Sequence, residues 1–206
     1  MNNLTVLQHG VGTSEILHRC FGKTTKDWAY RHGCGYVFSN RRSTPERTSY
    51  WEKPLFVYDE MCDSPSDKLW LDCDTFVVQP DKSPVGVLRD GADLAICLDK
   101  GMPFNSGLFF IRNNERTRAY MKAVYDLGDL PSDCFDQPRM IEQLQFHEIN
   151  IQILPWAWNA AHCCNIFHTG DTQEPIIKAY HGWPHEARFY WMERLMSNKT
   201  KLVKGA

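Results

Sequence analysis

The sequence predicts an α/β fold: a three-layer sandwich with a largely parallel central sheet and helices on both faces. Short apolar runs, typical of buried strands, alternate along the chain with longer segments whose apolar residues recur at helical spacing. Polar clusters directly follow several of these runs, and open α/β sheets bind ligands at the carboxyl ends of their strands. The 206 residues are enough to form one good-sized core or two small, closely joined halves.

The first half of the chain supplies most of the predicted sheet. A helix begins after the first strand, with Thr13 or Ser14 as its cap. Another helix is expected over 48–61, and Pro54 must either kink it or lie in its first turn. The strands predicted in this half are 4–7, 35–38, 69–71, 76–78 and 93–97.

The second half continues the alternation. Strands are predicted at 107–111, 149–154, 166–167 and 176–177. Helices are predicted over 115–127, from Asp136 with Pro138 in the first turn, and over about 184–196.

Composition excludes several classes of protein. Hydrophobic residues make up 43% and charged residues 23%, as in an ordinary soluble domain. The formal net charge of −2 argues against a nucleic-acid partner. No apolar run approaches the roughly 18 residues of a transmembrane helix, so we expect no membrane span. The N-terminus lacks the basic and apolar regions of a secretory signal, so the expected location is the cytoplasm.

The eight cysteines are scattered, without any Cys-x-x-Cys pair. In the expected cytoplasmic location, reduced thiols are the default. His162, Cys163, Cys164 and His168 are a conceivable zinc set, but their spacing is not that of a known zinc site. We therefore interpret the cysteines mainly as small buried apolar residues.

The segment Asp72-Cys73-Asp74 carries the strongest functional signal. It follows the apolar run Leu69-Trp70-Leu71, so a buried strand delivers two carboxylates into the turn at its end. Two such oxygen ligands suit Mg²⁺ or Mn²⁺. Solvated turn aspartates are the ordinary alternative, but the preceding strand favours a metal site.

Two further polar segments are each weak evidence on their own. Asn105-Ser106-Gly107 precedes a buried strand, where the glycine permits close approach of the backbone. The alternative is an ordinary turn. His181-Gly182-Trp183-Pro184-His185 lies at a strand-to-helix junction, where a tight turn and free N–H groups suit a diphosphate. The alternative is that both histidines are packed or surface residues.

Taken together, these three segments resemble those of the A-type (GT-A) glycosyltransferases, particularly the glycogenin and bacterial galactosyltransferase-like groups. The resemblance covers most of the chain and extends to small glycosyltransferases of chlorella viruses, which would place a viral enzyme in the host cytoplasm. It implies a Rossmann-like GT-A sandwich as one domain over 1–206. Nucleotide binding falls at about 1–100 and sugar and acceptor binding at about 101–206. Further domains of a longer protein would follow the last residue.

The resemblance also implies roles for individual residues. Asp72, Asp74 and His181 match the metal ligands for Mn²⁺ or Mg²⁺. Asp136 and Gln137 match an Asp-Gln pair beside the anomeric carbon, the catalytic position. The positions expected to bind the donor are Gln8, His9, Gly10, Lys53, Cys73, Asp99, Asn105, Ser106, Gly182, Trp183 and His185. The usual Lys-Pro-Trp after the late His-Gly is absent, so His185 would neutralise the diphosphate.

The predicted function is metal-dependent transfer of a hexose or deoxyhexose from a UDP-sugar to a glycan, glycoprotein or other hydroxyl acceptor, with retention of anomeric configuration. An alternative is a phosphohydrolase with an aspartyl nucleophile, whose motif also has two aspartates one residue apart. In that motif a residue separates the second aspartate from a threonine, whereas Thr75 follows Asp74 directly. A silent sugar-binding module is a further alternative, which would bind free sugars without metal.

Overall fold

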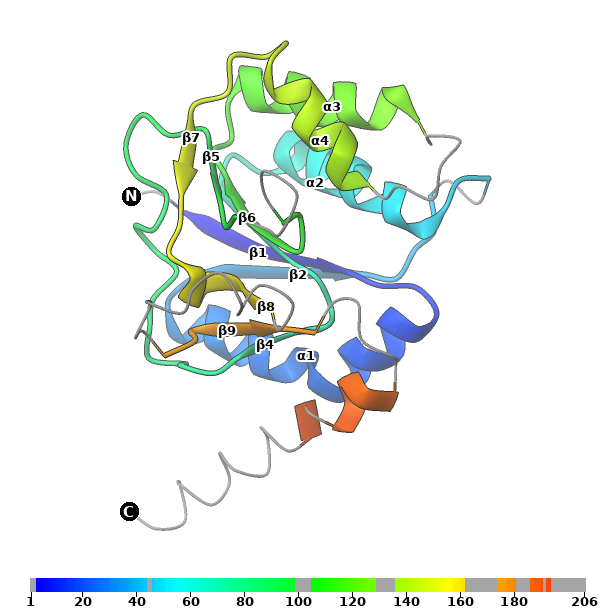
Figure 1. Ribbon diagram of the computed structural model, residues 1–206, viewed down its shortest axis with the longest axis vertical. Coiled ribbons are helices and arrows are strands. Elements are labelled where there is room, and N and C mark those ends of the chain that lie inside the picture. The colour runs from blue at the N-terminus through cyan, green and yellow to red at the C-terminus, as the bar shows by residue number, and fades with distance from the viewer. Residues whose placement is uncertain are drawn as a thin grey trace.

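The computed structural model describes residues 3–43, 46–98, 105–128, 136–161, 174–180, 186–190 and 192–193. At its centre is a six-stranded sheet with the order β2-β1-β3-β6-β5-β7 (Figure 1). Its strands are β1 (Leu4–His9), β2 (Gly35–Ser39), β3 (Asp67–Leu71), β5 (Leu94–Ile96), β6 (Leu108–Ile111) and β7 (Ile151–Ile153). These strands confirm the α/β fold expected from the sequence.

One strand of the central sheet runs against its neighbours. β1 pairs in parallel with β2 and β3, and β5 pairs in parallel with β7. β6 is antiparallel to both β3 and β5. The sheet is therefore mostly parallel but mixed. The reversal was not predicted, because apolar runs mark strands without giving their direction.

A second, smaller sheet lies beside the first. It has the order β4-β9-β8, with β4 (Thr75–Val77), β9 (Ile177–Ala179) and β8 (Ala160–Ala161). The sequence predicted that the run 76–78 continues just beyond the aspartates. The chain instead turns there, with the N–H of Thr75 bonded to the carbonyl of Asp72 at 3.1 Å, and enters the second sheet.

Helices cover both faces of the central sheet. The elements α2 (Glu52–Asp63), α3 (Glu115–Leu127) and α4 (Asp136–Leu144) lie on one face, and α1 (Thr13–Arg31) lies on the other with the small sheet (Figure 1). Short 3₁₀ turns occur at Ser49–Trp51 and Trp156–Asn159. Pro54 is the third residue of α2 and so lies in its first turn. The helix cap expected at Thr13 or Ser14 is wrong, because Gly12 is the cap and no side chain bonds there.

The central strands are buried on both faces, which produces two cores. Leu69 and Leu71 of β3 pack with Trp28 of α1, whereas Trp70 packs with Met61 of α2. The side chains of β6 also point alternately into the two cores, since successive side chains of a strand point to opposite faces. Continuous burial on both faces explains why the runs 69–71 of β3 and 108–111 of β6 are apolar throughout rather than alternating.

Two predicted elements lie partly or wholly outside the described residues. The strand predicted at 166–167 lies wholly outside them. Of the helix predicted over 184–196, residues 186–190 and 192–193 are described and are helical. Across the described residues, no helix has the length and apolar character needed to cross a membrane.

We predict that Phe110→Ala lowers the free energy of unfolding by about 3–5 kcal/mol. Phe110 is fully buried in β6, and its ring meets that of Trp158 edge-on at 5.6 Å between centroids. Urea unfolding followed by circular dichroism measures the loss. Phe146→Ala is the control, because that side chain is 65% exposed and its removal should cost less than about 0.5 kcal/mol. Equal losses in the two variants would contradict the placement of Phe110 in the core.

Candidate active site

The carboxylate of Asp72 is fixed at the carboxyl end of β3. Its Oδ1 accepts a hydrogen bond of 2.7 Å from the indole Nε1 of Trp70 and lies 3.3 Å from Nζ of Lys53. Trp70 and Asp72 are two residues apart, so an extended chain directs them to the same side. The Asp72 side chain remains 30% exposed, and it can therefore still meet a ligand.

Lys53 connects Asp72 to the other elements of the site. It comes from the first turn of α2 and is buried, with Nζ 3.1 Å from Oδ2 of Asp136 at the start of α4. The same ammonium donates to the carbonyl of Ser106 at 3.1 Å and to its hydroxyl at 3.2 Å. It also lies 5.4 Å from the centroid of the Trp70 ring, a cation–π distance. One ammonium thus holds α2, β3, α4 and the turn before β6 together.

The two buried charges perturb each other. Burial alone would lower the pKa of Lys53, but the carboxylates of Asp136 and Asp72 outweigh it and hold that pKa above its usual value. Burial raises the pKa of Asp136, and Lys53 opposes that rise. Lys53 is therefore charged at neutral pH, and the buried carboxyl of Asp136 depends on it for compensation.

The turn before β6 joins this cluster because β6 is reversed. Its first residues lie beside the end of β3, where Asp72 donates its N–H to the carbonyl of Gly107 at 2.9 Å. The N–H of Ser106 donates to Oε1 of Gln137 at 2.8 Å. Oδ1 of Asn105 accepts from the N–H of Gly107 at 2.8 Å and from Nδ2 of Asn159 at 3.0 Å. Five predicted residues, Lys53, Asp72, Ser106, Asp136 and Gln137, thus lie in one connected network.

Asp74 stands apart from this network and has a cation beside it. Its Oδ2 lies 2.9 Å from Nη1 of Arg188, and the two side chains are 9% and 18% exposed. The backbone carbonyl of Asp74 accepts from the N–H of Tyr180 at 3.1 Å. Tyr180 and Arg188 of the late part of the chain therefore both contact Asp74 in the turn after β3.

The end of β1 lies next to the same turn, but its residues largely support the backbone. Gln8 is buried, accepts from the hydroxyl of Tyr36 at 2.8 Å and donates weakly to the carbonyl of Asp72 at 3.4 Å. The thiol of Cys73 is buried and donates to the carbonyl of His9 at 3.3 Å. Burial, with the charges of Asp72 and Asp74, raises the pKa of that thiol well above its usual value.

His9 and Gly10 have local roles in the structure. Nε2 of His9 bonds with the carbonyl of Arg41 at 2.9 Å. A Cβ on Gly10 would stand 2.8 Å from the backbone of Ser14 and 3.0 Å from the Cys73 sulfur. Position 10 therefore has no room for a side chain, and its glycine permits the close approach of α1 to the turn.

Several predicted residues lie outside the described part of the chain: Asp99, His181, Gly182, Trp183 and His185, together with the conceivable zinc set His162, Cys163, Cys164 and His168. Within the described residues, no group of three or more His, Cys, Asp or Glu side chains is placed to hold a metal ion. Asp72 and Asp74 supply the hard oxygen donors that a divalent cation prefers. Tyr180, which binds Asp74, immediately precedes His181.

The sequence reasoning missed two residues of the site. Trp70 was assigned only to the strand, although its two-residue separation from Asp72 predicts that the two side chains share a side. Arg188 was not singled out, because one arginine in a helical segment carries no distinctive signal. Only the packing of that segment against the turn identifies it.

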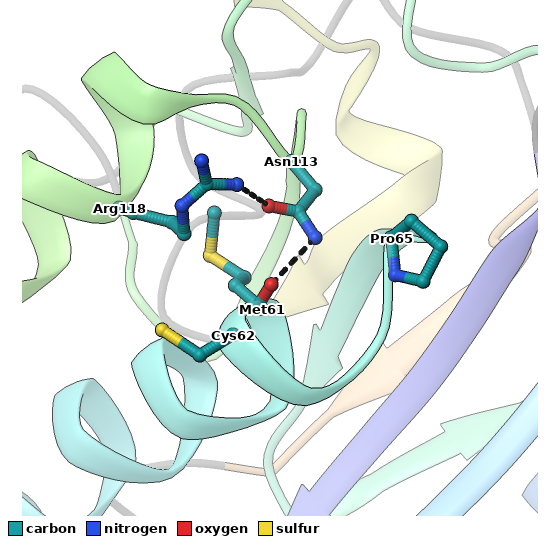
Figure 2. Close-up of a pocket in the computed structure, with 5 residues that line it drawn as sticks. All are labelled: Met61, Cys62, Pro65, Asn113 and Arg118. Atoms are coloured by element: carbon teal, nitrogen blue, oxygen red, sulfur yellow. Dashed lines mark hydrogen bonds between the residues drawn. The ribbon is translucent and has the colours of Figure 1, made fainter.

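A separate hollow lies at the opposite edge of the sheet, where β3 begins and β6 ends. Its volume is about 480 Å³, and it is lined by Met61, Cys62, Pro65, Asn113 and Arg118 (Figure 2). Its polar side chains already bind protein groups. Arg118 donates to Oδ1 of Asn113 at 2.7 Å, and Nδ2 of Asn113 donates to the carbonyl of Met61 at 2.8 Å (Figure 2). This hollow contains none of the predicted site residues.

No protein-family model and no curated protein matches this chain. Solved structures do. A glycosyltransferase involved in the glycosylation of the major capsid of PBCV-1 aligns with a TM-score of 0.75 and 17% identity, over 93% of this chain and 99% of that one. The galactosyltransferase LgtC, solved with donor and acceptor sugar analogues, gives a TM-score of 0.58 and 12% identity, over 94% of each chain.

A third match is the glycosyltransferase GlyE of Streptococcus pneumoniae TIGR4, with a TM-score of 0.57 and 13% identity, over 98% of this chain and 64% of that one. These likenesses define the class of fold: the chain has the GT-A fold of glycosyltransferases. The prediction of a Rossmann-like GT-A sandwich is thereby confirmed.

We predict that Lys53→Met lowers the free energy of unfolding by about 3–5 kcal/mol, because it leaves the buried carboxylate of Asp136 without its cation. Adding Asp136→Asn should recover at least about 1 kcal/mol, since an amide needs no counter-ion. Guanidinium unfolding of the two variants and the wild type measures both differences.

Lys122→Met is the matched control for this cycle, because Lys122 pairs with Asp126 on the exposed surface of α3. Its loss should cost no more than about 0.5 kcal/mol. A double variant less stable than Lys53→Met alone would contradict a buried pair between Lys53 and Asp136.

Proposed function

We propose that this protein is a metal-dependent glycosyltransferase that uses a UDP-sugar donor. The observation that carries the proposal is the convergence of Asp72, Lys53, Asp136 and Gln137 at one edge of a GT-A sheet. These residues come from β3, α2 and α4, and α/β sheets bind ligands at strand ends of this kind.

Asp72 and Asp74 would hold the divalent cation, with Mn²⁺ favoured over Mg²⁺ if the nitrogen of His181 completes the ligand set. When bound, the cation supplies Lewis-acid stabilisation of the negative charge that develops on the departing diphosphate. Asp72 is prepared for this role, since Trp70 and Lys53 both engage Oδ1 and fix the carboxylate in place. Such preorganised charge is most effective where water is excluded.

The remaining donor roles follow from the resemblance. Gln8, His9, Gly10 and Cys73 would line the uracil and ribose from the end of β1 and the turn after β3, through backbone groups where their side chains are occupied. Asn105 and Ser106 would face the sugar, together with Asp99. Gly182, Trp183 and His185 would close on the diphosphate. The donor would carry a hexose or deoxyhexose, and the acceptor a glycan or glycoprotein hydroxyl, in the cytoplasm of a cell or of a virus-infected host.

The state of Asp136 supports retention of configuration. An inverting enzyme needs a carboxylate base that can take the proton of the acceptor hydroxyl. The carboxylate of Asp136 is 1% exposed and bound to Lys53, and such a group is poorly placed to accept that proton. The amide nitrogen of Gln137 makes no hydrogen bond among the described residues, and it would lie beside the anomeric carbon. LgtC likewise has an active-site glutamine, whose change to glutamate has been crystallised.

We predict that Mn²⁺ strengthens UDP binding and that Asp74→Ala abolishes this effect. Isothermal titration with UDP, with Mn²⁺ and then with excess chelator, measures it, and a panel of UDP-sugars tested for metal-dependent hydrolysis identifies the donor. Asp81→Ala is the control, because the Asp81 side chain is 93% exposed and pairs with Arg31 in the last turn of α1 rather than with a residue of the site. An affinity for UDP that is the same with and without the chelator would overturn the proposal. Phosphorylation of Asp72 would instead indicate a phosphohydrolase.

We predict that the product keeps the anomeric configuration of the donor. Proton NMR of the new linkage decides this from its coupling constant. Asp136→Asn should leave the configuration unchanged even where it reduces the rate. Inverted product would refute retention and would make Asp136 the base.

A further inference from the structure

The ion pair between Asp74 and Arg188 has a consequence for metal binding. Oδ2 of Asp74 lies 2.9 Å from Nη1 of Arg188, and both side chains are largely buried. A guanidinium and a divalent cation compete for one carboxylate oxygen at contact distance, because like charges repel strongly where solvent is scarce. A cation that takes Oδ2 of Asp74 as its ligand therefore competes with Arg188 for that oxygen.

The segment that carries Arg188 is anchored to the protein by its apolar side chains. Met192 is fully buried in a cluster with Leu17 and Phe76, and the ring of Phe189 lies 6.0 Å from that of Phe21 in α1. Residues three and four apart share one face of a helix, so the side chains of Arg188 and Met192 lie on the same face of this helical segment. A displaced guanidinium would therefore stay within a side chain's length of the turn after β3.

We propose that Arg188 exchanges between two partners in the donor site, an inference that rests on the function proposed above. In the metal-free protein it neutralises the buried carboxylate of Asp74. When the cation takes that carboxylate, the guanidinium moves to the phosphates of the nucleoside diphosphate held by the same cation. Arginine suits this second role, because its planar fork binds phosphate oxygens in pairs.

The exchange gives Arg188 opposite effects on two ligands. It competes with the cation for Asp74, so its removal should tighten the binding of Mn²⁺ alone. It binds the diphosphate once the cation is present, so its removal should weaken the binding of UDP. A residue that only holds Asp74 in position would, on removal, weaken both.

The test is a pair of titrations on Arg188→Ala and the wild type. Electron paramagnetic resonance of free Mn²⁺ gives the affinity for the metal alone, and calorimetry at saturating Mn²⁺ gives the affinity for UDP. We expect Arg188→Ala to bind Mn²⁺ several-fold more tightly and UDP at least about tenfold more weakly, the equivalent of one charge-assisted hydrogen bond. Arg188→Lys, which keeps the charge but not the fork, should lie between the two in UDP affinity.

The matched control is Arg116→Ala, because Arg116 pairs at 3.1 Å with Asp93, whose side chain is as little exposed as that of Asp74. It should leave both affinities unchanged, and thermal melting of each variant confirms folding. Mn²⁺ affinity that is unchanged or weaker in Arg188→Ala, or UDP affinity that is unchanged, overturns the exchange. A wild type whose UDP binding does not respond to Mn²⁺ overturns the proposed function itself, so the two failures are distinct.

Discussion

The site depends on one buried ammonium. Lys53 lies between the carboxylates of Asp72 and Asp136, which repel each other and are separated by 64 residues of sequence. Without a cation between them, burial of Asp136 would be strongly unfavourable. With it, the start of α4 and the end of β3 come together, and the hydroxyl and carbonyl of Ser106 complete the coordination of the ammonium. The positions of Asp72 and Gln137 both follow from this arrangement.

The reversed direction of β6 is the second condition for the site. Were β6 parallel to β3, its first residues would lie at the edge of the sheet away from Asp72. Because the strand is antiparallel, Ser106 and Gly107 instead meet the turn after β3. An asparagine-serine turn that is unremarkable in the sequence thereby becomes part of the wall beside Asp72.

Sequence reasoning predicted the fold class correctly, and it singled out five residues that the structure brings into one network: Lys53, Asp72, Ser106, Asp136 and Gln137. The last three residues of β3, Leu69-Trp70-Leu71, are all apolar because they are buried, and the aspartates that follow stand out against them. It did not predict the direction of β6, because a run of apolar residues does not show whether the strand is parallel or antiparallel to its neighbours. It also did not place β4 in the second sheet. The turn at Asp72 depends on a backbone hydrogen bond, which cannot be predicted from residue types. Arg188 was missed because its importance comes only from packing against a distant turn.

The small sheet joins parts of the chain that are synthesised far apart in time. β4 follows Asp74 directly and pairs with β9, which ends at Ala179, so this ladder spans about 100 residues of sequence. Contacts of such long range form slowly, because closing a large loop costs entropy before the pairing compensates for it. On a ribosome, the side of the site that contains Asp74 therefore cannot assemble until β9 has emerged, whereas β1, β2 and β3 can pair much earlier.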